Sequence, residues 1–172
     1  YSVLLKDYNV KAELTATERV GFHKYTFPQS EQSNIIFSIG RQLGESGLAV
    51  DSKVTFVDDN RLEGFVTTKP EYVKKYQADA VVTMYFSAIL DKTPDAFGTF
   101  VNEEIQTGSK SAQGIGAGAY VTYNTQEGDA VNIKVGLSYT SIDNARLNLD
   151  TEAKEMTFEE AKKASLATWN DY

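Results

Sequence analysis

Apolar and polar residues alternate along most of this chain with a period of two, which is the period of a β-strand. The clearest example covers residues 131–140, and turn-forming residues at 126–129 precede it. Its apolar side consists of Val131, Ile133, Val135, Leu137 and Tyr139. This segment is predicted to be a strand with one face in a core.

The same pattern predicts strands along the rest of the chain. Residues 1–6 and 10–17 alternate on either side of Asp7–Asn9, so a hairpin is expected there. Further strands are predicted at residues 34–40, 48–58, 62–68, 80–90 and 119–125. Residues 80–90 are apolar on one face and mixed on the other, which favours a central strand. Residues 58–61 are predicted to form a turn.

The segment Thr17–Pro28 places charges, the only histidine and three aromatic residues together. As a strand it has two faces that each mix polar and apolar groups, with Arg19 and His23 on one face and Glu18 on the other. We expect Gly21 to form a bulge or bend where the pattern changes. A pattern in which both faces mix polar and apolar groups is typical of a strand whose end lies at a cleft or against another domain.

Only the end of the chain changes period. Thr157 followed by Glu160 is a capping box, and it predicts a helix over about 157–171. Trp169 shares a helical stripe with Phe158 and Ala161, so core or interdomain packing is predicted for it, with a sugar-stacking surface as the alternative.

Many short strands without alternating helices predict antiparallel sheets packed face to face. The fold class is therefore expected to be all-β, an antiparallel β-sandwich with a C-terminal helix. We expect one domain over 1–172, because the polar loop 106–111 does not divide the chain. The chain begins within a strand pattern and ends within a helix pattern, which suggests a fragment of a longer protein.

Composition excludes several kinds of function. With 17 Lys and Arg against 24 Asp and Glu, the net charge of −7 repels a phosphate backbone, so no nucleic-acid partner is expected. The chain has no cysteine, which excludes thiolate chemistry and cysteine zinc sites. No apolar run reaches the roughly 18 residues of a membrane span.

Few residues are candidates for chemistry. His23 is the only histidine, so any histidine-dependent triad or metal site must include it. The simpler interpretation is a hydrogen-bonded packing residue, and the alternative is a role facing another domain. Neighbours on a strand point to opposite faces, so Glu18 and Arg19 are expected to pair with other strands rather than with each other.

The acidic residues do not suggest a catalytic pair or a metal site. Glu103 and Glu104 are adjacent in an extended segment, and residues 58–60 lie in the predicted turn without the spacing of a calcium loop. Gly114–Gly118 lacks the following helix of a phosphate-binding loop, so close sheet packing is the better interpretation. We therefore predict no catalytic residue and no metal ligand in this chain.

Two segments of the sequence resemble one enzyme family. The segment Thr17–Pro28 is similar to an early strand of glycoside hydrolase family 92, the calcium-dependent α-mannosidases of bacteria. The segment Gly136–Ser141, followed by Asn144–Leu149 and Glu152, resembles the part that closes the family's N-terminal β-sandwich. The resemblance implies a supersandwich-like, non-catalytic domain that lacks the family's Gly/Pro-rich first stretch.

The resemblance also implies a function for the intact protein. It would be an inverting exo-α-1,2-mannosidase that acts on high-mannose N-glycans or mannans in the periplasm, at the cell surface or outside the cell. This chain would support a downstream helical catalytic domain, reached through the helix at 157–171, and help to wall the sugar pocket. Ca²⁺ would be the cofactor of the intact enzyme and would not be held by this fragment alone. Glu18, Arg19 and His23 would lie near the substrate or the domain interface.

Two alternatives belong to other classes of protein. The chain could be a stand-alone carbohydrate-binding module, which would bind mannan without another domain. It could also be a structural or adhesive sandwich with no affinity for sugar.

Overall fold

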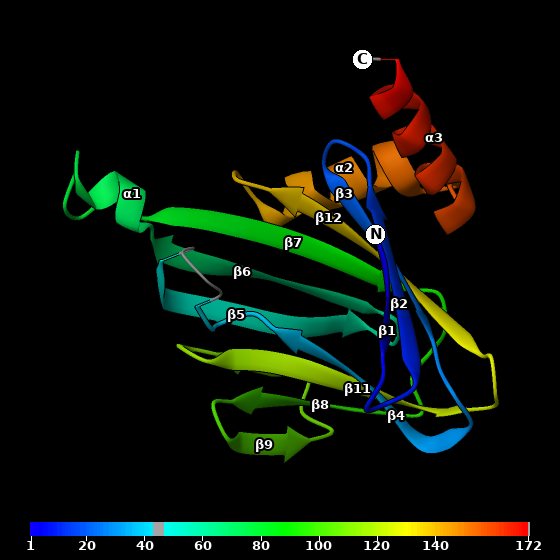
Figure 1. The fold of residues 1–172 in the computed structure, drawn as a ribbon. Helices are drawn as coiled ribbons and strands as arrows, with labels where there is room; N and C mark the ends of the chain where they lie inside the picture. The colour runs from blue at the N-terminus through cyan, green and yellow to red at the C-terminus, as the bar shows by residue number, and fades with distance from the viewer. Residues whose placement is uncertain (43–46, 172) are drawn as a thin grey trace.

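The structure, a computed structural model, describes residues 1–42 and 47–171 and forms two antiparallel β-sheets packed face to face (Figure 1). Residues 43–46 and 172 of the expected domain lie outside the described residues. The large sheet has the order β1 (Ser2–Leu5), β2 (Val10–Ala16), β3 (Val20–Thr26), β12 (Ala130–Ser138), β7 (Val82–Leu90), β6 (Arg61–Lys69), β5 (Leu48–Asp58) and β10 (Ser111–Gln113). The small sheet has the order β4 (Ser30–Ser38), β11 (Ala117–Thr125), β8 (Ala96–Val101) and β9 (Glu104–Thr107). The predicted all-β sandwich is confirmed.

The main core lies between the two sheets and is built from alternate residues of most of the strands, as a period of two requires. Phe86, Ala88 and Leu90 of β7 point into it, which confirms the predicted central strand. From the small sheet, Ala119 and Val121 of β11 fill the opposite side. Because inward residues alternate with outward ones, each sheet also has an outer face whose side chains leave this core.

The segment Thr17–Pro28 is not one strand, and the bulge expected at Gly21 is wrong. A turn follows β2, in which the amide of Thr17 donates to the carbonyl of Val20 at 2.9 Å. Strand β3 begins at Val20, and its pairing runs without a register shift through Gly21, opposite Ala16 on β2 and Val135 on β12. The change in polarity that suggested a bulge marks the end of a turn instead.

Three helices complete the described chain. The short α1 (Glu71–Lys74) lies at the tip of the large sheet, whereas α2 (Ile142–Ala153) and α3 (Phe158–Asn170) lie on that sheet's outer side (Figure 1). The predicted capping box at the start of α3 is present, with Thr157 and Glu160 bonded in both directions. Helix α2 was not predicted. None of the helices in the described parts of the chain is long and apolar enough to cross a bilayer.

Helix α2 packs directly on β12 because the sheet has a glycine at the contact. A Cβ atom on Gly136 would lie 2.3 Å from the carbonyl oxygen of Ala145 and 2.7 Å from Cβ of Leu149. Ala145 and Leu149 are fully buried in this contact. A larger residue at position 136 would therefore push the helix away from the sheet.

Helix α3 packs on a second, smaller core on the same side of the large sheet. Val20 and Phe22 of β3 form it together with Ala153, Phe158 and Ala161. Trp169, two turns further along α3, does not reach it and is 77% exposed. Core packing of Trp169 within this chain is therefore wrong, because the second half of α3 extends beyond the sheet.

Candidate functional site

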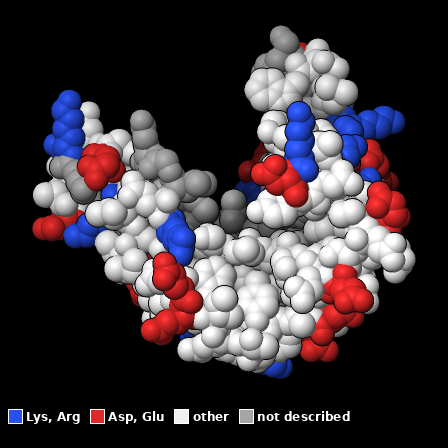
Figure 2. Space-filling view, turned by 60° about the horizontal axis from the view of Figure 1, so that its bottom comes forward, with Lys and Arg blue, Asp and Glu red and all other residues white. Residues whose placement is uncertain are grey.

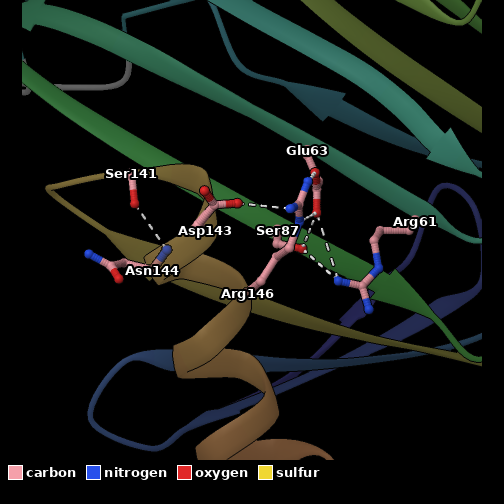
Figure 3. A network of polar contacts seen from close by, with 7 residues as sticks. All are labelled: Arg61, Glu63, Ser87, Ser141, Asp143, Asn144 and Arg146. Atoms are coloured by element: carbon pink, nitrogen blue, oxygen red, sulfur yellow. Dashed lines mark hydrogen bonds and ion pairs between the residues drawn. The ribbon is translucent and has the colours of Figure 1, made fainter.

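A network of polar side chains lies where α2 crosses the outer face of the large sheet (Figure 3). Glu63, in the middle of β6, is only 3% exposed. Arg146 of α2 donates from Nε and Nη2 to the two carboxylate oxygens of Glu63, each at 2.5 Å. Ser87 of β7 donates to the same carboxylate at 3.0 Å, and Nη1 of Arg61 lies 3.8 Å from it. We call these four residues the Glu63 cluster.

Strand pairing and helix capping bring the cluster together. Glu63 and Ser87 face each other in the register of β6 and β7, and Arg61 precedes Glu63 by two residues and so shares its face. Ser141 caps α2 by accepting from the amide of Asn144 at 3.0 Å, which fixes where the helix begins (Figure 3). One turn later, Arg146 reaches the sheet while its Nη1 donates to Asp143 at 2.9 Å.

Electrostatics keep Glu63 ionised. Burial alone raises the pKa of the Glu63 carboxyl, but the hydrogen bonds from Arg146 and Ser87 and the nearby guanidinium charges outweigh it and lower the pKa. The hydrogen bonds that Arg146 donates to Glu63 in turn raise the pKa of Arg146. A carboxylate held in this way does not release and take up protons near neutral pH. The cluster therefore anchors a helix and is not suited to general acid or base catalysis.

A second anchor holds the other end of α2. Glu152 accepts from the hydroxyl of Thr17 at 2.5 Å, from the amide of Arg19 at 3.0 Å and from Nε of Arg19 at 2.5 Å. The side-chain amine of Lys134, on β12, donates to the carbonyl of Ala153 at 2.7 Å. This contact stabilises the C-terminal end of α2, because a positive charge interacts favourably with the helix dipole there. Helix α2 is thus bonded to the sheet at both ends.

The structure does not gather the three residues singled out in the sequence. Arg19 belongs to the second anchor and pairs with a helix, so the expected pairing with another strand is wrong. Glu18 is exposed in the same turn and makes no hydrogen bond or ion pair with the parts of the chain that the structure describes. His23 is on the face of β3 that looks toward the small sheet, where its Nδ1 lies 3.0 Å from the hydroxyl of Tyr25. Burial lowers the pKa of His23.

From the sequence, Glu63 is not singled out, and Arg146 and Glu152 are included only as part of the segment that resembles the family, with no role assigned to either. Glu63 looks like an ordinary outward residue of an alternating strand, and it is buried only because α2 covers it. The signal that could have been found is the polar pair at positions 63 and 87, each of which lies between two apolar neighbours, together with the Ser141 cap. If a helix beginning after Ser141 lies across these strands, then Arg146, about one turn from its start, is the expected partner of Glu63.

Among the residues that the structure describes, no cluster of side chains suggests a calcium site. Within residues 1–42 and 47–171, no three histidine, cysteine, aspartate or glutamate side chains lie close enough to hold a metal ion. In the 58–60 turn, the side-chain amide of Asn60 donates to the carbonyl of Leu90 at 3.1 Å, so the turn is built around a backbone contact. Calcium needs six to eight oxygen ligands, and the acidic side chains of the described residues do not gather into such a set.

Acid is expected to destabilise the chain in two stages. His23 has a pKa below its ordinary 6.5 in the folded protein, so below pH 6.5 protons bind preferentially to the unfolded chain. Glu63 and Glu152 have pKa values below 4.5, so the stability that they contribute above pH 4.5 is lost as the pH falls further. Urea unfolding between pH 8 and pH 3 should show both losses, and His23→Gln should remove only the first. Stability that rises on acidification would contradict the prediction.

Beyond α2, part of the large sheet's outer face is uncovered. Figure 2 shows the molecule hollowed between an arm that carries α1 and an arm that carries α3. On the outer face of β6 and β7, the rings of Phe65 and Tyr85 lie 6.1 Å apart, and the hydroxyls of Thr67 and Thr83 are 2.8 Å apart. None of these four side chains is fully buried.

The fold is an antiparallel β-sandwich with two helices held on the outer side of its large sheet. The model of the glycosyl hydrolase family 92 N-terminal domain matches residues 1–138, and the chain belongs to this family. This agrees with the family indicated by its sequence motifs. No curated protein matches the chain.

Solved structures of family members share the fold. The family 92 α-mannosidase BT3965 of Bacteroides thetaiotaomicron superposes with a TM-score of 0.88 and 25% identity, over 99% of this chain and 23% of that protein. The family 92 inverting mannosidase BT2199 of the same species gives a TM-score of 0.80 at 17% identity, over 100% of this chain and 22% of that protein. The chain thus spans less than a quarter of the length of these relatives.

Proposed function

We propose that this chain is the N-terminal, non-catalytic domain of an exo-acting α-mannosidase, and that it holds a downstream catalytic domain in place through α2 and α3. The observation that carries the proposal is the attachment of α2 at both ends, by the Glu63 cluster and by Glu152. A helix bonded at both ends and packed on Gly136 can fix the direction in which the chain leaves the sheet. Similarity to full-length α-mannosidases supports the assignment.

The outer surface of the helices supports a contact with another domain. Leu147 of α2 and Leu166 and Trp169 of α3 are each at least 60% exposed, although they are large and apolar. Such residues, together with the uncovered face of β6 and β7, offer apolar area that a neighbouring domain would bury. In this proposal, Glu18 and Arg19 lie close to the domain interface, whereas the half-buried His23 lies on the other face of the large sheet, beside Tyr25.

The finer features of the reaction belong to the same proposal. We expect inversion, cleavage of α-1,2-linked mannose from high-mannose N-glycans or mannans, and a calcium ion in the downstream domain. Parts of the sandwich would help to wall the sugar pocket. The intact protein would act in the periplasm, at the cell surface or outside the cell.

Expression of the parent polypeptide tests the proposal. With calcium, the chain joined to its natural downstream sequence should release mannose from α-1,2-mannobiose, and the 172-residue chain alone should release none.

A double variant tests the role of the helices. Leu166→Ala combined with Trp169→Ala should lower the activity of the parent by about tenfold or more, because loss of the domain contact displaces catalytic groups that must be positioned accurately. The matched control Tyr8→Ala changes an exposed aromatic residue far from α3 and should leave activity unchanged. Hydrolysis by the 172-residue chain, or a parent inactive on every α-mannoside tried, would refute the proposal.

A further inference from the structure

The outer face of the small sheet carries a groove of about 700 Å³, on the opposite side of the molecule from α2 and α3. Side chains from all four strands of the sheet line it. The strand pairing sets Ile36, Tyr120 and Gly98 in one row across the sheet, and Ser38, Gly118 and Phe100 in the next. Its volume lies within the range of about 300–1,000 Å³ that is typical of small-molecule sites.

Two aromatic rings lie along the floor of this groove because each faces a glycine on the neighbouring strand. A Cβ atom on Gly98 would lie 2.6 Å from the hydroxyl oxygen of Tyr120, and one on Gly118 would lie 2.1 Å from Cζ of Phe100. The far end of each ring therefore occupies the space that a side chain on the opposite strand would take. The rings lie across the sheet instead of standing away from it, and both remain partly exposed.

The margins of the groove are apolar on two sides and polar elsewhere. Ile36 and Ile105 flank the rings and are 65% and 68% exposed. Amide and hydroxyl groups of Asn34 and Thr122 border one end, where the Thr122 hydroxyl donates to Asn34 at 2.7 Å. At the other end, Arg41 donates to the carbonyl of Asn102 at 3.3 Å.

The lining does not favour a charged ligand. Arg41 and Glu103 are its only charged members among the described residues, and their charges are opposite. The middle of the face turned toward the viewer in Figure 2, which is the bottom of Figure 1, consists of uncharged residues. Flat rings with amide and hydroxyl groups around them match a pyranose, which has an apolar C–H face and a rim of hydroxyl groups.

We propose that this groove binds a neutral chain of α-linked mannose, away from the side of the domain on which α2 and α3 lie. The rings of Tyr120 and Phe100 stack against sugar rings, and the amide and hydroxyl groups at the margins bond to sugar hydroxyls. The choice of mannose rests on the proposed function, whereas the position of the site rests on the ring and glycine geometry. Such a site would keep the enzyme on its polymeric substrate between cleavage events.

The test is an NMR titration of the ¹⁵N-labelled 172-residue chain with α-1,2-mannobiose, with xylobiose as the comparison sugar. We expect saturable shifts at the amides of β8 and β11 with mannobiose. Tyr120→Ala should weaken binding at least tenfold, and Ile105→Asp, at an exposed position that leaves the core intact, should weaken it at least fivefold. The control Trp169→Ala removes an exposed aromatic residue on α3 and should not change binding.

The inference would be overturned if mannobiose caused no saturable shifts, or if only xylobiose bound. It would also be overturned if the Tyr120 and Ile105 variants bound mannobiose as tightly as the unchanged chain does. These outcomes are separate from the test of the proposed function, which measures mannose release by the parent polypeptide. A parent that hydrolyses α-1,2-mannobiose while this groove binds no mannobiose would leave the proposed function standing and remove only the binding site.

Discussion

Replacing Arg146 with methionine is expected to lower the free energy of unfolding by about 3 kcal/mol, because it leaves Glu63 buried and without its main partner. Glu63 is 3% exposed, and Arg146 satisfies both of its carboxylate oxygens. The methionine still covers the sheet, so the loss measures the uncompensated charge more than lost packing. Urea unfolding at pH 7 provides the measurement.

Two controls separate charge from packing. The double variant Glu63→Leu with Arg146→Met removes both charges and should recover most of the lost stability, as apolar replacements of buried ion pairs commonly do. Asp143→Asn removes the exposed partner of Arg146 and should cost less than about 0.5 kcal/mol. If Arg146→Met alone were as stable as the unchanged chain, Glu63 would have to be hydrated or protonated, and the anchor would not exist as described.

The strands could be predicted because their alternation is local. Residues 48–58 and 130–138 form strands close to the expected bounds, since alternate residues such as Val54 and Phe56 in the first and Val131 and Ile133 in the second enter the core between the sheets. The turn between β2 and β3 could not be predicted, for the opposite reason. Thr17 and Arg19 form a turn stabilised by Glu152, which is more than a hundred residues away in sequence, and no local pattern contains that contact.

Helix α2 could not be predicted from its apolar residues. It fully buries only Ala145, Leu149 and Ala153, two of which are small. The contact becomes close because Gly136 on the sheet leaves room for the helix backbone. The position of α2 therefore depends on both the helix residues and Gly136 on β12, and neither segment has a distinctive sequence pattern by itself.

The polar contacts of the candidate site also join segments that are far apart in the sequence, so the sequence predicts only part of the site. Arg19 lies in a segment with an unusual pattern, but its partner Glu152 can be recognised only from the position of α2 on the sheet. Glu63 lies on the outward face of β6, where alternation predicts solvent, and the covering helix converts an ordinary strand residue into a buried charge. A sequence read by strand period alone assigns such residues to the surface.

Replacing Phe22 with alanine is expected to lower the free energy of unfolding by about 3–4 kcal/mol and to release α3 from the sheet. Phe22 is 2% exposed and forms the small core with Phe158 and Ala161, the only residues of α3 that are buried. Without the ring, the first turn of α3 loses its support while the core between the sheets stays intact. Hydrogen exchange should therefore show faster opening in α3 than in β11 or β12.

Phe56→Ala is the matched control, because Phe56 is equally part of a core but lies between the two sheets. It should destabilise the chain by a similar amount and speed exchange throughout the sandwich, without singling out α3. In the parent polypeptide, Phe22→Ala should reduce mannose release more than Phe56→Ala at temperatures where both remain folded, since only Phe22 fixes the helix that leads out of the domain. Equal exchange in α3 for the two variants would mean that α3 is held by other contacts, and the helix could then not transmit the position of the sandwich to its neighbour.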